Sequence, residues 1–274
     1  MTVEDGSPLA PPIPRSPVVR QVTLADVRAA FHAGWQDFKS APLFGLFFGA
    51  FYALGGILIC ILMFWLNMIY MVIPLVIGFM LIGPFVAVGL YEVSRSLEEG
   101  RSLSWSGVLG VMLKQREREF VWMSFVTLFV FWVWIYQVRL LLALFFGLKT
   151  FSTYSTFLAL LLTTSNGIAF LIVGNLVGAA LALLLFSITV VSFPLLLDRE
   201  VDFITAMITS VKSVTTSPLP MIVWAMVIGL LTLLAVVPAF LGLIFVLPIL
   251  GHATWHLYRR IVAPPGEAIS TRSQ

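Results

Sequence analysis

Charged residues and cysteine are both scarce in this 274-residue chain. Only 11% of its residues are charged, whereas 60% are hydrophobic, and its mean hydropathy is +1.03. Soluble domains are about 25% charged and ~45–50% apolar, so the composition excludes a soluble globular protein. The long charge-free runs predict an all-α polytopic membrane protein. The single cysteine, Cys60, excludes an internal disulfide, and its apolar surroundings are typical of a small buried hydrophobic residue.

The sequence also lacks the common patterns of catalysis and ligand binding. It contains neither H-E-x-x-H nor G-x-S-x-G, and no phosphate-binding glycine loop. His252 and His256 lie four residues apart, a spacing that can hold a metal on one helical face. No cysteine or nearby carboxylate in that segment completes a ligand set, so packing at the membrane interface is the preferred interpretation. We expect no catalytic residue, metal or cofactor, and the small net charge of +3 argues against a nucleic-acid partner.

Six hydrophobic runs are long enough to cross a bilayer, because about 20 apolar residues span its ~30 Å hydrocarbon layer as a helix. The expected spans are residues 43–66, 71–91, 120–139, 168–197, 220–237 and 240–258. Together they form a six-span domain over residues 22–262. The ends, residues 1–21 and 263–274, are polar or rich in proline and are expected to be disordered tails without a cleaved signal peptide.

The basic residues predict the orientation of these spans. Of the sixteen lysine and arginine residues, all except Arg139 and Lys149 fall in the two tails or in the connections on the same side. The positive-inside rule therefore places both termini in the cytoplasm. Residues 140–166 lie on the other side, where we expect one or two helices on the membrane surface, with a re-entrant loop as the alternative.

A short segment occurs three times in the same order. Residues 25–42 (ADVRAAFHAGWQDFKSAP) align without a gap on residues 201–218 (VDFITAMITSVKSVTTSP). The first copy has an apolar stripe at three- and four-residue steps, which predicts an amphipathic helix lying in the membrane interface. Thr23 is expected to cap it, with Asp26 in the reciprocal position, and Asp202 to cap the later copy.

A weaker middle copy begins at Ser104, which is its expected cap. Each copy is followed by one span and then by a second span that contains a proline, namely Pro84, Pro194 or Pro248. The sequence therefore predicts three repeats, at about 22–97, 103–200 and 201–260, each an interfacial helix followed by a helical hairpin.

Polar residues and small residues within the apolar runs are further candidates for functional or packing positions. Arg139 lies near the outer end of its span, where snorkelling or a structural pair is favoured over a substrate site. Asn175 is interpreted as an interhelical hydrogen-bonding residue. Asp198 and Arg199 belong to a dense charged corner, which is either an ion network between repeats or a docking site. The motifs Gly45-x-x-x-Gly49 and Gly174-x-x-x-Gly178 allow close helix packing, within the chain or between chains.

Several long stretches resemble a known family. GLFFGAFYALGGIL, LIGPFVAVGLYEVSR, FVTLFVFWVWIYQVRLLLALF, VVSFPLLLDREVDFITAMITSV and LPILGHATWHLYRR are similar to the bacterial membrane family called domain of unknown function 2189. The resemblance implies a six-span protein of the bacterial inner membrane, mostly of alphaproteobacteria, with no established activity. Members are sometimes labelled cytochrome c oxidase subunit I, but that subunit needs six histidines and this chain has three. The paired spans also loosely resemble the membrane domain of some glycerophosphodiester phosphodiesterases, whose catalytic domain is missing here.

These observations favour a non-enzymatic protein with a structural or interaction role. It would organise lipid or assist the assembly or stability of other membrane proteins, with membrane lipids, other membrane proteins or further copies of itself as partners. A small-solute transporter or channel is the alternative, with a site near Pro84, Pro194 and Asn175, because broken helices often frame substrate sites. A third interpretation is a lipid-modifying enzyme that uses His252 and His256.

Overall fold

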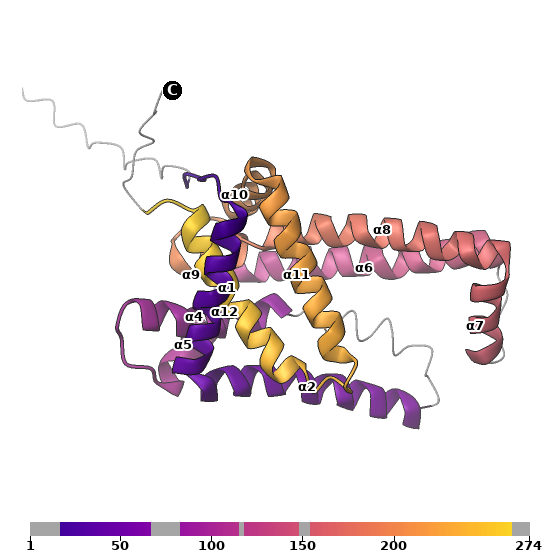
Figure 1. Ribbon diagram of the computed structural model, residues 1–274, viewed down its shortest axis with the longest axis horizontal. Coiled ribbons are helices and arrows are strands. Elements are labelled where there is room, and N and C mark those ends of the chain that lie inside the picture. The colour runs from indigo at the N-terminus through magenta and orange to yellow at the C-terminus, as the bar shows by residue number, and fades with distance from the viewer. Residues whose placement is uncertain (1–16, 67–82, 115–117, 148–153, 265–274) are drawn as a thin grey trace, which may run out of the picture.

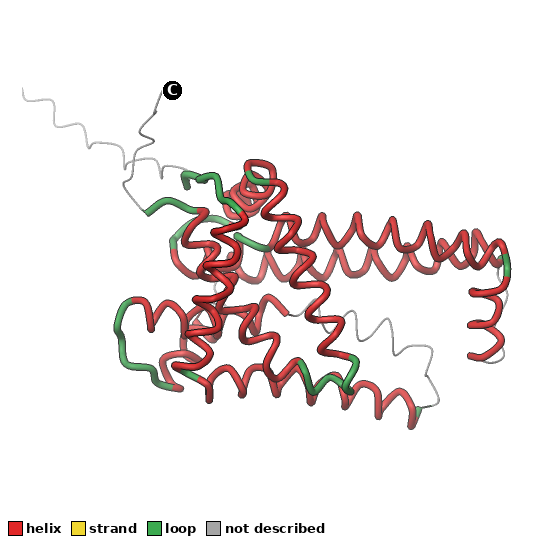
Figure 2. The backbone as a smooth tube through the Cα atoms, viewed as in Figure 1, coloured by secondary structure: helices red, strands yellow, loops and turns green. Residues whose placement is uncertain are grey.

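The computed structural model describes residues 17–66, 83–114, 118–147 and 154–264, and within these residues every regular element is a helix (Figures 1 and 2). The predicted all-α class is therefore confirmed for the described part of the chain. The helices are α1 (Leu24–Ser40), α2 (Pro42–Trp65), α4 (Gly83–Glu98), α5 (Trp105–Lys114), α6 (Arg118–Phe146), α7 (Tyr154–Thr163), α8 (Ser165–Thr189), α9 (Ser192–Asp198), α10 (Phe203–Thr216), α11 (Pro218–Val236) and α12 (Leu243–Ile261).

The helices α1, α4, α9, α10 and α12 pack into a body that we call the head (Figure 1). Its centre is α12, which contacts α1 most extensively and also packs against α2 and α4. Close approach requires small residues, since a Cβ added to Gly34 of α1 would lie 2.4 Å from the backbone nitrogen of Ala253. Trp255, Tyr258 and Phe193 are fully buried in the core of the head. Large buried aromatic side chains contribute strongly to such a core.

The helices α6 and α8 form an arm that extends away from the head, with α7 at its far end (Figure 1). The second small-residue motif packs inside this arm. A Cβ added to Gly178 would lie 3.0 Å from the ring of Trp134, and one added to Gly174 would lie 4.0 Å from Leu141. Both partners belong to α6, so this motif joins two helices of one chain.

The first and last of the predicted interfacial helices, α1 and α10, are both capped at the start and have similar C-terminal junctions. Thr23 caps α1 in a capping box with Asp26, and the Asp202 side chain accepts a hydrogen bond at the start of α10, so both predicted caps are confirmed. The C-cap residues have similar dihedral angles, φ −133° and ψ 56° at Ala41 and φ −134° and ψ 63° at Ser217. Each is followed directly by a proline that begins the next helix, a position where a missing N–H costs nothing.

Of the three prolines predicted in the second span of each repeat, Pro194 and Pro248 have described surroundings, and these surroundings differ. Pro194 is the third residue of α9, which follows a break in the fourth expected span after Thr189. The backbone N–H of Val191 in this break donates to the hydroxyl of Ser210 at 3.1 Å. Pro248, in contrast, lies inside the continuous helix α12. The side chain of Pro84, near the start of α4, lies outside the described residues.

By length and composition, four helical segments among the described residues are able to cross a membrane. They are Pro42–Trp65, Glu119–Phe146, Ser165–Asp198 and Pro218–Val236. They correspond to four of the six expected spans. The sixth expected span, residues 240–258, is not among them, because the second half of α12 carries polar and charged residues. That half is also buried in the head. The second expected span, residues 71–91, falls largely outside the described residues.

Candidate functional site

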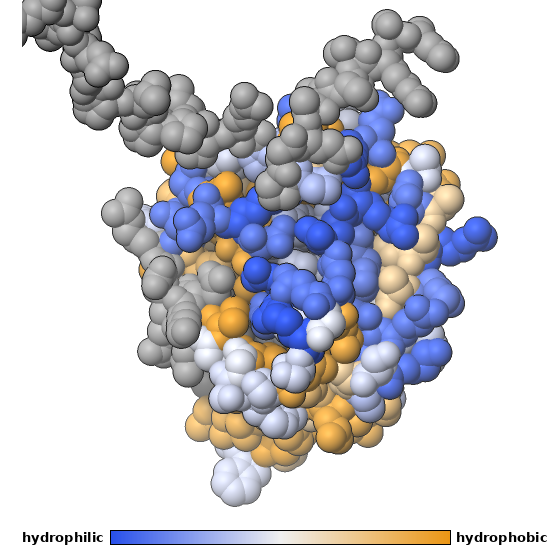
Figure 3. Space-filling model, turned by 90° about the vertical axis from the view of Figure 1, so that its left-hand side faces the viewer, coloured by the Kyte–Doolittle hydropathy of each residue, from blue (hydrophilic) through white to orange (hydrophobic). Residues whose placement is uncertain are grey.

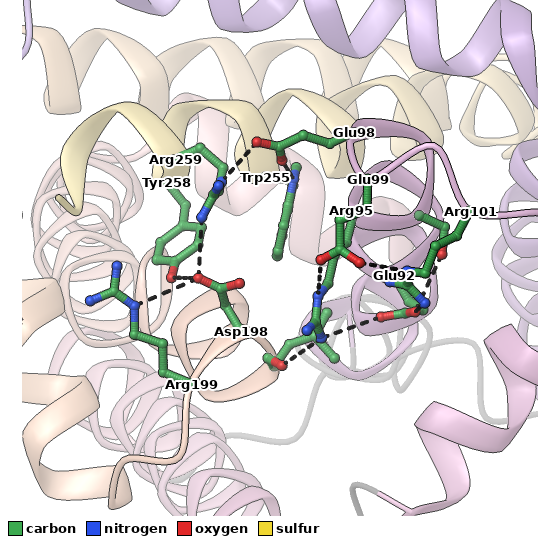
Figure 4. Close-up of polar contacts among 12 residues, drawn as sticks. Glu92, Arg95, Glu98, Glu99, Arg101, Asp198, Arg199, Trp255, Tyr258 and Arg259 are labelled. Atoms are coloured by element: carbon green, nitrogen blue, oxygen red, sulfur yellow. Dashed lines mark hydrogen bonds and ion pairs between the residues drawn. The ribbon is translucent and has the colours of Figure 1, made fainter. Parts of the chain in front are cut away.

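Charged side chains gather where the end of α4, the end of α9 and the last turn of α12 meet. We call this set the charged cluster, and it consists of Glu92, Arg95, Glu98, Glu99, Arg101, Asp198, Arg199 and Arg259 (Figure 4). Hydrophilic residues also dominate the surface on the side of the head opposite to the arm (Figure 3). A charged face at one end of an apolar helical protein is the part that contacts water.

Asp198 is the centre of one half of the charged cluster. The phenol of Tyr258 donates to its Oδ2 at 2.6 Å, and Arg259 Nη1 lies 3.4 Å from the same oxygen. Arg199 Nε is 3.7 Å from Oδ2. The Asp198 side chain is only 13% exposed, so its charge is compensated in a partly desolvated position. These contacts join α9 to α12, which are far apart in the sequence.

Two glutamates on α4 extend the charged cluster. Glu98 accepts a hydrogen bond from the indole of Trp255 at 3.1 Å and pairs with Arg259 at 3.1 Å. The side chain of Glu92 is only 4% exposed and pairs with Arg101 Nη1 at 3.1 Å. Arg95 forms ion pairs with both Glu92 and Glu99. It also donates to the backbone carbonyl of Leu197 in α9 at 3.3 Å. The charged cluster therefore ties together all three helix ends.

The charged forms of Glu99 and Arg259 are favoured. Burial works against ionisation of Glu99, but hydrogen bonds from Arg95 and Arg101 outweigh it and hold the pKa of Glu99 below its ordinary value. Burial likewise disfavours the charge of Arg259, but the nearby carboxylates of Glu98 and Asp198 outweigh it and raise the pKa of Arg259. A set of groups held in this way is suited to clamp helices together or to present charge to a partner.

The two histidines of α12 face different partners. His256 Nε2 lies 2.7 Å from Asp37 Oδ2 of α1, and the buried His252 Nδ1 lies 2.7 Å from the hydroxyl of Ser94 on α4. Among the residues that the structure describes, no three His, Cys, Asp or Glu side chains gather in a way that could hold a metal ion. The arrangement is that of two hydrogen bonds that fix α12 between α1 and α4.

The structure separates the other sequence candidates. Asp198 and Arg199 belong to the charged cluster, whereas Arg139 and Asn175 are exposed on the arm. The amide of Asn175 donates to the carbonyl of Leu171 in its own helix at 2.7 Å. Pro194 is buried at the start of α9.

Sequence reasoning did not single out the glutamates of the charged cluster. Their only local signal is the run of charged residues at three- and four-residue steps from Glu92 to Arg101, which is typical of ion pairs along one helix face. The partners on α9 and α12 lie about a hundred or more positions further along the chain, so no sequence spacing could indicate them.

Comparison with known proteins gives one match. Residues 71–198 match the family described as predicted integral membrane protein (DUF2189), which agrees with the resemblance seen in the sequence. The matched segment includes α4 to α9 and contains all of the charged cluster except Arg199 and Arg259. Neither the curated proteins nor the solved structures contain a match.

Proposed function

We propose that this chain, a member of the DUF2189 family of predicted integral membrane proteins, is a non-enzymatic protein whose arm contacts other membrane proteins and assists their assembly or stability. The observation that supports this role best is the difference in burial between the apolar helices. Within the apolar windows of α6 and α8, only 6% and 0% of the residues are buried, whereas the values for α2 and α11 are 28% and 22%. Almost every residue in these windows of the arm is therefore at least partly exposed, apart from the surface that α6 and α8 bury against each other.

One face of α6 has a regular pattern that suits a partner helix. Its exposed aromatic side chains recur at alternating steps of three and four residues, at Trp122, Phe125, Phe129, Trp132 and Tyr136. This 3.5-residue spacing is the one with which a helix presents a continuous seam to a second helix. We call this set the aromatic stripe. Each of its members is at least 45% exposed, so a transmembrane helix of another protein is able to pack along it.

A photo-crosslinking residue placed in the aromatic stripe tests this role in native membranes. We expect Phe129 substituted in this way to give one reproducible protein adduct. Leu176, which is exposed on α8, is the matched control and should give mainly lipid adducts. The partner is then identified by mass spectrometry. Lipid adducts alone at both positions would contradict the assembly role.

We also propose that the chain crosses the bacterial inner membrane six times, with both termini in the cytoplasm and three related hairpins. In Figure 1 the chain leaves the head along α2 and along α6 and returns to it along α8. The distribution of basic residues supports this orientation. Cysteines introduced at Lys39 and Lys212, with Cys60 replaced by serine, should react with an impermeant reagent only from the cytoplasmic side. Labelling of the two positions from opposite sides would exclude this topology.

A further inference from the structure

An open groove of about 540 Å³ lies between α1, α11 and α12. Its walls are almost entirely apolar, with Leu231 from α11 and Val246 and Ile249 from α12, while α1 contributes Arg28 and His32 to its lining. This volume is within the usual range for small-molecule sites. The groove therefore has an apolar floor, built by a helical hairpin, and Arg28 and His32 of α1 contribute mainly their carbon atoms to its surface, with their nitrogen atoms outside it.

The charges of α1 are divided between two sides of the helix. At 100° per residue, Asp26 and Asp37 lie within about 20° of each other, and they pair with Arg260 and His256 of α12 at 3.1 and 2.7 Å. The basic positions lie roughly on the opposite side of α1 and are Arg28, His32 and Lys39. The acidic groups of α1 are thus engaged away from the groove, and the side that borders it carries the basic side chains of this helix.

The basic groups of the groove are available to a ligand. Arg28 and His32 are exposed, and neither makes a hydrogen bond or an ion pair with another described residue. Among the residues that the structure describes, no acidic side chain lines the groove. Trp35, half-exposed in the same lining, is an aromatic residue of the kind that sits at the level of lipid headgroups. An occupant that complements this surface has an anionic head and an apolar tail.

We propose that this groove binds an anionic glycerophospholipid, with its phosphate on Arg28 and His32 and an acyl chain along Leu231, Val246 and Ile249. Basic residues at a membrane surface attract anionic lipid, and the guanidinium group is suited to bidentate phosphate contact. The proposal depends on insertion of α11 in a membrane. It does not depend on the aromatic stripe, so a failed crosslinking experiment at Phe129 leaves it intact.

Native mass spectrometry of the purified full-length protein tests this site. The protein is titrated with phosphatidylglycerol and with phosphatidylcholine that carry identical acyl chains. We expect the first phosphatidylglycerol to bind the wild type at least tenfold more tightly than phosphatidylcholine does. The double variant Arg28→Gln/His32→Gln should lose this preference, with about a fivefold weakening of phosphatidylglycerol binding from the loss of the Arg28 charge alone. The matched control Lys212→Gln, which removes an exposed charge from α10, should keep the preference.

A second variant tests the apolar part of the groove. Leu231→Trp fills the space beside Val246 with an apolar side chain, so it should weaken the binding of both lipids while the protein remains folded and monodisperse. Equal preference in the wild type and in the double variant would overturn the proposal. So would displacement of phosphatidylglycerol by soluble glycerol phosphate together with unchanged binding in Leu231→Trp, since that result describes an anion site without a place for lipid.

Discussion

Gly49 of α2 lies against a part of α12 that has an unusual backbone. Pro248 has no N–H, so the carbonyl of Ile244, four residues earlier, loses its normal helical hydrogen bond. A Cβ added to Gly49 would lie 2.3 Å from this carbonyl oxygen and 2.7 Å from the carbonyl carbon. An ordinary carbon–oxygen contact is about 3.3 Å, so Gly49→Ala requires α2 and α12 to separate by roughly 1 Å. The obstacle is backbone, which cannot rotate away as a side chain can.

We expect Gly49→Ala to cost about 1–3 kcal/mol, the usual penalty for overpacking a tight interface. A loss of ~2 kcal/mol lowers the melting midpoint by roughly 4–8 °C in a chain of this size. The measurement is a thermal scan of the purified protein in detergent, followed by size-exclusion chromatography. Gly229→Ala is the matched control, because a Cβ at Gly229 of α11 meets nothing within 4 Å and alanine favours helix. Equal midpoints for the two variants would refute the close contact between α2 and α12.

Three further predictions concern polar groups of the head. Glu92→Gln should lower the melting midpoint more than Glu99→Gln, because the Glu92 side chain is 4% exposed and that of Glu99 is 44% exposed; equal losses would contradict the importance of burial. Asp202→Ala should cost ~1 kcal/mol at neutral pH by removing the cap of α10. The hydroxyl of Thr205 in the first turn lowers the pKa of Asp202 below its ordinary 3.8. The stabilisation by this cap is therefore present above pH 3.8 and is lost as the pH falls further. A pH series of melting scans should show the midpoints of wild type and variant converging in acid. Ser210→Ala should destabilise more than Pro194→Ala in the same assay, since it leaves a buried backbone N–H without its acceptor, at a cost of about 1–3 kcal/mol.

The caps and the helix–proline junctions were predictable because their chemistry is local. Thr23 and Asp202 each bond to a backbone N–H three residues further on, and a sequence displays that spacing directly. The same holds for Ser104, whose hydroxyl accepts from the N–H of Gly107 at 3.1 Å as expected of a cap. The proline after Ala41 and after Ser217 likewise marks the start of the next helix. Local signals of this kind identified the predicted interfacial helices α1, α5 and α10.

The interior position of α12 was not predictable in the same way. Its first half is apolar, so hydropathy predicts a membrane span there, but nothing local in the sequence indicates that the second half, with His252 and His256, packs inside the head. The structure surrounds the second half with α1, α4 and α9, whose polar groups reach it from positions far away in the sequence. Hydropathy measures how each residue transfers between solvents, whereas burial in the head depends on which helices pack together. For the same reason the sequence left open whether the small-residue motifs join helices of one chain.

The two ends of the described chain are held together by their backbones. The N–H of Arg20 donates to the carbonyl of Ile261 at 2.7 Å, and the N–H of Ala263 donates to the carbonyl of Val18 at 3.0 Å. In the proposed topology, ends that meet in this way require the chain to cross the bilayer an even number of times, whatever route it takes in between. A reporter protein fused at either end would therefore sense the same compartment, and joining the ends with a short linker should leave room to open the chain at a new position without disturbing the bundle.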